Sequence, residues 1–243
     1  VTTKKAVYNL AREGIDYSRG GYYDAGNPSG EPAEDTPAAR AFWALLTPKT
    51  PAQLQAEDAA RQLVEISRCK IPGYFPTPSA VAADLVRYAG ISDGDRVLEP
   101  SAGSGAILDA IKARTPLANI AAYEVNPSLA KYLETNGHTL AGEDFTEAKP
   151  DAAGVDAVVM NPPFEKGQDM DHVRHAFDFL KPGGRLVAIM APGFQYRGDK
   201  RAVAFRAWLQ NLEHFTRDLP AGTFKDSGTG VASVVVYIEK ESN

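Results

Sequence analysis

Residues 155–160, Val-Asp-Ala-Val-Val-Met, are the feature that most limits how this chain can fold. Five of the six are apolar and three are valine, which predicts a buried strand. Pro162 and Pro163 follow almost at once and end the strand, because proline has no backbone N–H for a sheet ladder. Asn161 is therefore predicted at the carboxyl end of a strand, where open α/β sheets place their ligands.

The residues Asn161, Pro162, Pro163 and Phe164 suit one kind of chemistry. An amine conjugated to an aromatic ring is a poor nucleophile because its lone pair is delocalised. The Asn161 side-chain oxygen and the Pro162 carbonyl offer two acceptors for the amine hydrogens, and Phe164 offers a ring on which the substrate ring can stack. We expect these residues to hold an exocyclic amine for methylation. The alternative is a plain strand-to-turn stop with a partly buried phenylalanine.

A nucleotide-binding pattern lies upstream. A strand predicted at 96–99 is followed by the loop Pro100-Ser-Ala-Gly103-Ser-Gly105 and by a helix predicted at 106–114. The next predicted strand, 120–124, ends in Glu124, nineteen residues after Gly105, where a carboxylate can accept both hydroxyls of a ribose. Asp144 and Phe145 follow a short strand predicted at 138–141 and offer an acceptor and a flat apolar surface for an adenine.

The other elements complete an α/β sheet. Thr77 and Pro78 predict a capped helix start, a polar loop is expected at 165–171, and His172 and His175 are expected on the surface. Asn126 and Asp199 are expected to cap helices, and a fifth strand is predicted at 185–190. The last two strands, 214–219 and 231–238, have no helix between them, which predicts an antiparallel pair at the sheet edge. The predicted fold is Rossmann-like, with a mostly parallel seven-stranded sheet and an antiparallel edge strand.

The first part of the chain differs in pattern from the rest. Residues 1–33 are rich in turn formers, and a short helix is expected at 37–46. Thr50, Pro51 and Gln53 form a helix start with a capping box, and that helix is predicted to run to about Arg68. We therefore predict a helical N-terminal extension over residues 1–70 and a catalytic domain over residues 71–243.

Composition limits the partners and the compartment. The net charge of −5 disfavours broad electrostatic binding of nucleic acid, so a local patch at Arg197, Lys200 and Arg201 is the expected contact. The single Cys69 forms no internal disulfide and no metal site. No charged-then-apolar leader opens the chain, and the longest apolar runs are too short to cross a membrane. A cytoplasmic location is the simplest expectation.

The motifs over roughly residues 71–240, taken together and in their order along the chain, resemble those of one known family. They are Phe75-Pro-Thr77-Pro78, Val97-Leu-Glu99-Pro-Ser-Ala-Gly103-Ser-Gly105, Tyr123-Glu124, Asp144-Phe145, Asn161-Pro-Pro-Phe164 and Leu219-Pro-Ala-Gly-Thr-Phe. The chain resembles the gamma-type adenine-N6 DNA methyltransferases, which are class I S-adenosylmethionine-dependent enzymes. The resemblance implies that the cofactor S-adenosyl-L-methionine binds at Phe75, Thr77, Glu99, Pro100, Ser101, Ala102, Gly103, Gly105, Glu124, Val125, Asp144, Phe145 and Asn161.

The same resemblance implies direct methyl transfer to the N6 amine of a flipped-out adenine in DNA, without a metal. Gamma-type enzymes usually carry a large target-recognition domain after the catalytic one, whereas the sheet pattern here ends near residue 240. Sequence readout is then expected from residues 1–70, from a specificity subunit or a second copy of the chain, or hardly at all. RNA or protein glutamine as the substrate, and a non-catalytic subunit that binds the cofactor, are the alternatives.

Overall fold

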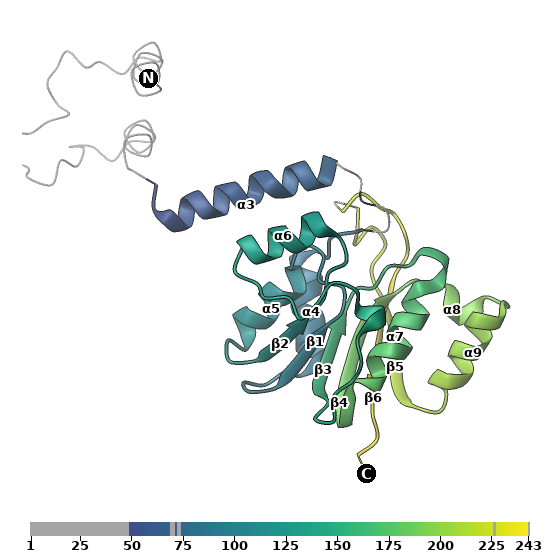
Figure 1. Ribbon diagram of the computed structural model, residues 1–243. Helices are drawn as coiled ribbons and strands as arrows, with labels where there is room; N and C mark the ends of the chain where they lie inside the picture. The colour runs from purple at the N-terminus through teal and green to yellow at the C-terminus, as the bar shows by residue number, and fades with distance from the viewer. Residues whose placement is uncertain (1–48, 69–70, 72–73, 226, 243) are drawn as a thin grey trace, which may run out of the picture. The chain divides into compact units, whose positions relative to one another are not determined.

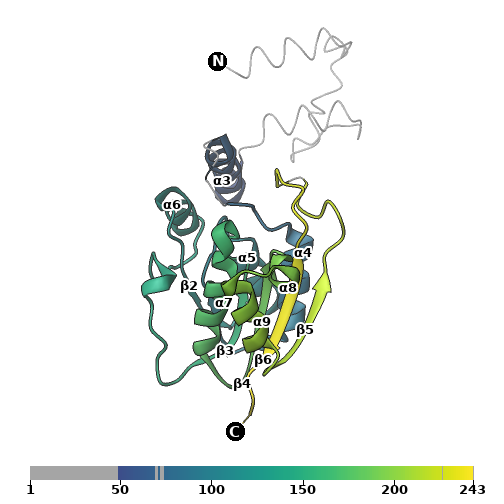
Figure 2. The ribbon, with the colours of Figure 1, turned by 90° about the vertical axis from the view of Figure 1, so that its right-hand side faces the viewer.

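A mixed β-sheet flanked by helices forms the centre of the computed structural model, which describes residues 49–68, 71, 74–225 and 227–242. Within this part of the chain the sheet has six strands, in the order β2-β1-β3-β4-β6-β5. Figure 1 shows β2 at one side of the sheet, and Figure 2 shows β5 at the other. The strands are β1 (Arg96–Glu99), β2 (Asn119–Ala122), β3 (Val155–Met160), β4 (Leu180–Met190), β5 (Glu213–Asp218) and β6 (Val234–Glu239).

Helices cover both faces of the sheet, because alternate residues of each strand point to opposite sides. Ala157 and Val159 of β3 pack with α4 and α5, whereas Val158 and Met160 pack with α7 and α9. All four of these β3 side chains are fully buried, which places β3 at the centre of the core. The helices are α3 (Pro51–Arg68), α4 (Ser79–Ala89), α5 (Ala106–Arg114), α6 (Pro127–Thr135), α7 (Gln168–Asp178), α8 (Gly193–Tyr196) and α9 (Lys200–Leu209), with 3-10 turns η2 (Phe145–Glu147) and η3 (Glu165–Gly167).

The predicted Rossmann-like fold is confirmed, and β1, α5 and β3 have the bounds expected from the sequence. The count of seven strands is wrong for the described residues. The segment 138–141 forms no strand, and the only pairing near it is an isolated bridge between Tyr123 and Gly142. The antiparallel pair at the edge is confirmed, but the antiparallel strand is β6, which lies between β4 and the edge strand β5.

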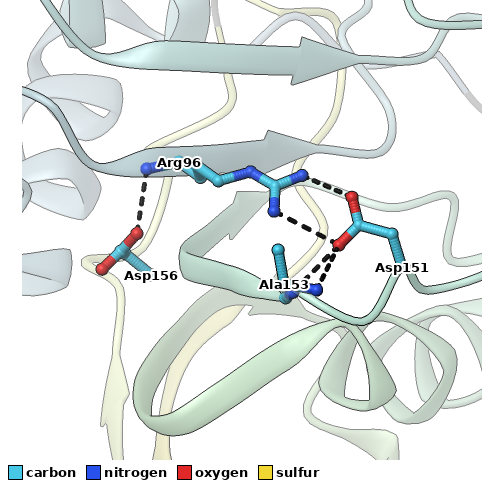
Figure 3. Close-up of polar contacts among 5 residues, drawn as sticks. Arg96, Asp151, Ala153 and Asp156 are labelled. Atoms are coloured by element: carbon cyan, nitrogen blue, oxygen red, sulfur yellow. Dashed lines mark hydrogen bonds and ion pairs between the residues drawn. The ribbon is translucent and has the colours of Figure 1, made fainter.

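A charged cluster fixes the amino-terminal ends of β1 and β3 (Figure 3). The Arg96 backbone N–H donates to Asp156 at 3.0 Å, and the Arg96 guanidinium donates to both oxygens of Asp151, at 3.2 and 2.5 Å. One oxygen of Asp151 also accepts the N–H groups of Ala153 and Gly154. These bonds hold the strands in parallel at the end away from Asn161, so the carboxyl ends lie together at the opposite edge.

The chain divides into two units, residues 1–58 and 59–243. In the first unit the described residues 49–58 include the start of α3, where the predicted capping box is confirmed. The Thr50 N–H donates to Gln53 Oε1 at 2.9 Å, and the Gln53 N–H donates to Thr50 Oγ1 at 3.2 Å. The helix predicted at 37–46, the turn-rich segment 1–33 and Cys69 lie outside the described residues. The domain boundary at residue 70 stays a prediction.

The segment after Phe164 differs from its prediction as a polar loop. Residues 165–167 form η3, and residues 168–171 form the first turn of α7 instead of a loop. Lys166 (φ 52°) and Gly167 (φ 73°) both have a left-handed backbone conformation, and they turn the chain sharply between Phe164 and α7. The chain after Phe164 is therefore an ordered turn into a helix.

None of the helices in the described part of the chain combines the length and the apolar character that a membrane crossing requires.

Asp169 joins α7 to the end of β4. It is 2% exposed, and its Oδ2 accepts the Ala191 N–H at 3.0 Å. Burial raises the pKa of Asp169 to about 6, although the backbone hydrogen bonds and the Arg197 charge oppose this shift. The buried carboxylate is therefore less stable in the folded protein than in the unfolded chain.

We predict that Asp169→Asn removes a pH dependence of stability. Because the folded pKa lies above the unfolded value of 3.8, the contribution of Asp169 to the free energy of unfolding falls as pH rises from about 4 to about 6. The fall is on the order of 1–3 kcal/mol. Asparagine keeps an acceptor for Ala191 without the charge, so urea denaturation should show the variant gaining stability relative to the wild type by this amount between about pH 4 and about pH 6. Asp178→Asn, at an exposed carboxyl on the same helix, is the control. Equal slopes in wild type and Asp169→Asn would contradict this assignment.

Candidate active site

A cavity of about 630 Å³ opens at the carboxyl ends of β1, β2 and β3. Its walls come from segments far apart in the sequence, and they bring together most of the residues that the sequence analysis selected. Those residues are Phe75, Thr77, Glu99, Pro100, Ser101, Ala102, Gly103, Glu124, Val125, Asp144, Phe145, Asn161, Pro162, Pro163 and Phe164. Gly105 does not line the cavity. It has φ +88°, and a Cβ there would lie 2.8 Å from Leu133, so Gly105 lets the loop pack closely on α6.

Asn161 is held in one orientation by the segment before α4. Its Nδ2 donates to Thr77 Oγ1 at 3.0 Å and to the Phe75 carbonyl at 3.3 Å. A carbonyl can only accept, so the amide nitrogen must face Phe75. The Asn161 Oδ1 therefore faces the other way, and within the described residues it accepts no hydrogen bond. The predicted role of Thr77 as a helix cap is wrong: α4 has Pro78 at its N-cap position and no side-chain cap bond.

Glu124 closes the glycine loop. Its Oε2 accepts the Gly103 N–H at 2.7 Å, and its Oε1 accepts the Asn126 N–H at 2.8 Å. Burial raises the pKa of Glu124, and the two N–H donors partly oppose that shift. Each oxygen keeps a second lone pair, so the carboxylate can still accept hydrogen bonds from a ligand in the cavity.

Glu99, at the end of β1, is the least satisfied charge in the site. It is 1% exposed, and neither carboxylate oxygen has a hydrogen-bond partner among the described residues. Burial, and then the negative charge of Glu124, raise the pKa of Glu99 well above its ordinary value. An unpaired buried carboxylate is costly, and a cation in the cavity would offset that cost.

Asp144 and Phe145 form the wall beyond β2. Asp144 Oδ1 accepts both the N–H and the hydroxyl of Thr146, at 2.8 and 2.7 Å, which lowers the pKa of Asp144. Phe145 is 2% exposed, and its ring lies between Tyr123, His175 and Phe179 at centroid distances of 4.7–5.5 Å. Phe145 also lines the cavity, so this aromatic packing fixes the position of its ring in the wall.

His172 and His175 were expected on the surface near the site, and both are half-buried. His172 lines the cavity, and its Nδ1 is buried without a partner within the described residues. Burial lowers the pKa of His172. His175 is partly buried, and its Nε2 lies 3.2 Å from the Phe145 carbonyl. The described residues contain no group of three ligands that could hold a metal ion.

The loop between β5 and β6 supplies a wall that sequence reasoning did not assign to the site. Phe224, Thr229, Val231 and Ser233 line the cavity. Ser227 Oγ donates to the Pro76 carbonyl at 2.6 Å, which ties this loop to the segment that holds Asn161. Tyr74 also lines the cavity, and a Cβ at Gly103 would lie 3.0 Å from its ring. A tertiary bond such as Ser227–Pro76 leaves no local sequence signal.

The three basic residues expected to contact nucleic acid lie outside the cavity. Arg197 Nε pairs with Asp199 at 2.9 Å, and Arg201 Nη2 pairs with Asp171 at 3.5 Å. The Arg201 Nη1 also donates to the carbonyl of Lys166, so Arg201 holds the left-handed turn after Phe164. Lys200 is exposed at the first position of α9.

Comparison with known proteins identifies a family that this chain matches. Residues 85–217 match the model of the family described as "Methyltransferase small domain". One relative, the ribosomal RNA small subunit methyltransferase C of Hahella chejuensis, is 28% identical over 174 residues. That match covers 65% of this chain and 47% of the relative, so the chain spans about half the length of this curated relative.

Solved structures share the fold. A chain from Vibrio vulnificus described as the modification subunit of a type I restriction enzyme superposes with a TM-score of 0.64 at 18% identity, over 81% of this chain and 51% of that one. A Listeria monocytogenes protein described as a class I S-adenosylmethionine-dependent methyltransferase superposes with a TM-score of 0.61 at 12% identity, over 97% and 78%.

We predict that Glu99→Gln weakens S-adenosylmethionine binding by about 10- to 100-fold, the effect of losing a charged partner worth about 1.5–3 kcal/mol. Glutamine keeps the shape of the side chain and removes its charge. In the wild type the affinity should rise with pH as Glu99 loses its proton, and the variant should lose this dependence. Calorimetry on both proteins checks this, with Glu134→Gln on the exposed face of α6 as the control. Unchanged affinity in Glu99→Gln would contradict the role of its charge.

The residues present fit a cationic nucleoside cofactor. Glu99 is a buried carboxylate with no hydrogen-bond partner among the described residues, and Glu124 is a second carboxylate. In the glycine loop, a Cβ at Gly103 would crowd Tyr74 and a Cβ at Gly105 would crowd Leu133. The family match covers more than half of the chain. This chain therefore belongs to the methyltransferase small domain family, and its cofactor is S-adenosylmethionine.

Proposed function

We propose that this chain transfers a methyl group from S-adenosylmethionine to the exocyclic N6 amine of adenine in DNA. The observation that carries the proposal is the fixed orientation of Asn161. Because its Nδ2 is held by Phe75 and Thr77, its Oδ1 stays available for the N–H of an amine in the cavity.

The acceptor amine is a poor nucleophile because its lone pair is delocalised into the purine ring. Asn161 Oδ1 and the Pro162 carbonyl accept its two hydrogens and draw the nitrogen toward tetrahedral geometry. Phe164, which is partly buried and packs against the core near Phe224, stacks on the ring that carries the amine. S-adenosylmethionine would supply a methyl group activated by its sulfonium. The S–C bond would break as the N–C bond forms, the neutral thioether would leave, and the methylated nitrogen would lose one of its hydrogens as a proton. No side-chain nucleophile is required, so the work of the protein is orientation and charge.

In the cofactor half of the cavity, different residues suit different parts of the cofactor. Glu99 would face the positive charge of the cofactor, and Phe75 and Thr77 would hold its methionine end. Glu124 would accept the ribose hydroxyls, with Gly103 and Val125 beside it. Asp144 would accept the amine of the cofactor adenine, and Phe145 would contact its ring. All of these residues line the cavity. The loop 100–102 completes this wall, and Gly105 shapes it from outside.

DNA is favoured by the order of the motifs and is compatible with the fold shared with a type I modification subunit. In a duplex the adenine must leave the stack to reach Asn161. A specificity subunit or a second copy of the chain would then supply sequence readout. RNA is the second candidate, because the ribosomal RNA methyltransferase is 28% identical over 174 residues.

The substrate class is tested with S-adenosylmethionine that carries a radiolabelled methyl group. The full chain is incubated with DNA, RNA and protein pools of the same cells, and each pool is counted after purification. Label in DNA supports the proposal, and label confined to RNA supports the second candidate. Label only in protein would contradict both.

We predict that Asn161→Ala lowers turnover by about 100-fold or more, because it removes a preorganised acceptor. Cofactor affinity should stay nearly unchanged, since the assigned cofactor contacts lie mainly at Glu99, Glu124 and Asp144. Thr77→Val is the matched comparison, measured at saturating S-adenosylmethionine because Thr77 is also assigned to the methionine end of the cofactor. It removes one of the two bonds that hold Asn161 and leaves the other, so its loss should be smaller. Single-turnover kinetics and calorimetry measure the two effects, and wild-type turnover in Asn161→Ala would contradict the mechanism.

We predict that the double variant Arg197→Ala/Lys200→Ala binds DNA more weakly and with a shallower salt dependence. Losing two phosphate contacts should reduce the slope of log affinity against log salt by roughly 2. Arg201→Ala is measured separately, because Arg201 also holds the turn at Lys166. Arg114→Ala/Lys149→Ala, which removes two exposed charges elsewhere, is the control. An unchanged slope would place the DNA path elsewhere.

A further inference from the structure

Among the described residues, none pairs with the outer edge of strand β5. All six of its residues are exposed, and within the described residues it pairs only with β6 (Figure 2). An open strand edge of this kind can accept another strand. What it accepts depends on which backbone groups point outward and on the side chains beside them.

The register with β6 identifies the outward groups. The Leu219 N–H donates to the carbonyl of Ser233, which lies opposite it in the register that pairs Asp218 with Val234. Hydrogen-bonded pairs alternate along an antiparallel ladder. Residues 213, 215 and 217 therefore bond to β6, whereas the N–H and C=O groups of His214, Thr216 and Asp218 face outward.

The side chains of Glu213, Phe215 and Arg217 share one face of β5. Phe215 is 43% exposed and stacks on Tyr237 of β6, with ring centroids 4.8 Å apart and planes at 12°. Arg217 donates to the Tyr88 hydroxyl, and Tyr88 meets Phe215 edge-on at 6.2 Å. An exposed aromatic ring thus lies between an acidic and a basic side chain.

We infer that β5 pairs with the β5 strand of a second copy of this chain, antiparallel, about a two-fold axis at Phe215. His214 and Thr216 then exchange backbone hydrogen bonds across the axis, using the outward groups. Phe215 meets Phe215 of the second copy, and each Glu213 lies opposite Arg217 of the second copy. These are non-hydrogen-bonded pairs, in which side chains approach most closely.

Charges on an edge strand ordinarily discourage pairing. Here the order of the charges makes the strand complementary to itself, and it does so in one register. Moving the axis to Thr216 would place Glu213 opposite Leu219 and Phe215 opposite Arg217, which leaves both charges of this face unpaired. A single strand pair with a small aromatic contact buries little surface, so we expect a dissociation constant in the micromolar range.

The pairing keeps the two cavities apart. β5 and β4 are both antiparallel to β6, so the carboxyl end of β5 points toward the cavity edge of the sheet. Antiparallel pairing of two β5 strands directs the cavities to opposite ends of one continuous sheet. Cofactor affinity per chain should therefore not depend on dimerisation.

The test is sedimentation velocity on the full chain over a range of concentrations. Glu213→Arg and Arg217→Glu each place like charges across the axis, so each variant should dimerise at least tenfold more weakly than the wild type. An equimolar mixture of the two variants should dimerise again, because every pair across the axis is then opposite in charge. Glu134→Arg makes the same charge change on α6 and should behave like the wild type.

The mixture also controls for misfolding, because a variant that had lost its fold would not regain dimerisation when the other variant is added. The double variant Glu213→Arg/Arg217→Glu should also dimerise, since both pairs are reversed. Calorimetry with S-adenosylmethionine should give equal affinity in all variants. A wild type that stays monomeric throughout, or a mixture that does not recover, would overturn the inference.

Discussion

The two hydrogen bonds from Asn161 Nδ2 join parts of the chain that are 84 and 86 residues apart. They connect the end of β3 to the segment that leads into α4, and the cavity lies between these two elements. Asn161 can make them because β3 is fully buried and in fixed register with β1 and β4, and because two prolines stop the strand directly after it. One amide thus closes the wall of the site and leaves its oxygen for the substrate.

A second constraint is the negative charge gathered at the carboxyl edge of the sheet. Glu99 and Glu124 are both buried there, and they differ in how they are satisfied. Glu124 accepts two backbone N–H groups, so it shapes the glycine loop whether or not a ligand is bound. Glu99 accepts none within the described residues, and burial raises its pKa. Glu124 therefore stabilises the glycine loop even without a ligand, whereas the carboxylate of Glu99 can pair with a positively charged group of a ligand.

The sequence predicted the parts of the fold that depend on local chemistry. The apolar run of β3, the glycine loop before α5, the capping box at Thr50 and the cap at Asn126 all have the form expected from their residues. The failures have tertiary causes. Thr77 stands before a proline as a helix cap does, yet its hydroxyl accepts a hydrogen bond from Asn161 instead of capping α4. His172 has the polarity of a surface residue, yet it is half-buried and lines the cavity, a position that depends on tertiary packing.

In the mechanism that we propose, Asn161 holds the exocyclic amine of an adenine in DNA. The most direct measurement is mass spectrometry of nucleosides from DNA that has been incubated with the full chain and S-adenosylmethionine carrying a deuterated methyl group. Asn161→Ala serves as the blank. We expect a mass increase on deoxyadenosine, at the N6 position, that is absent with the variant. Deuterated methyl groups on carbon atoms, or on the amines of other bases only, would contradict it.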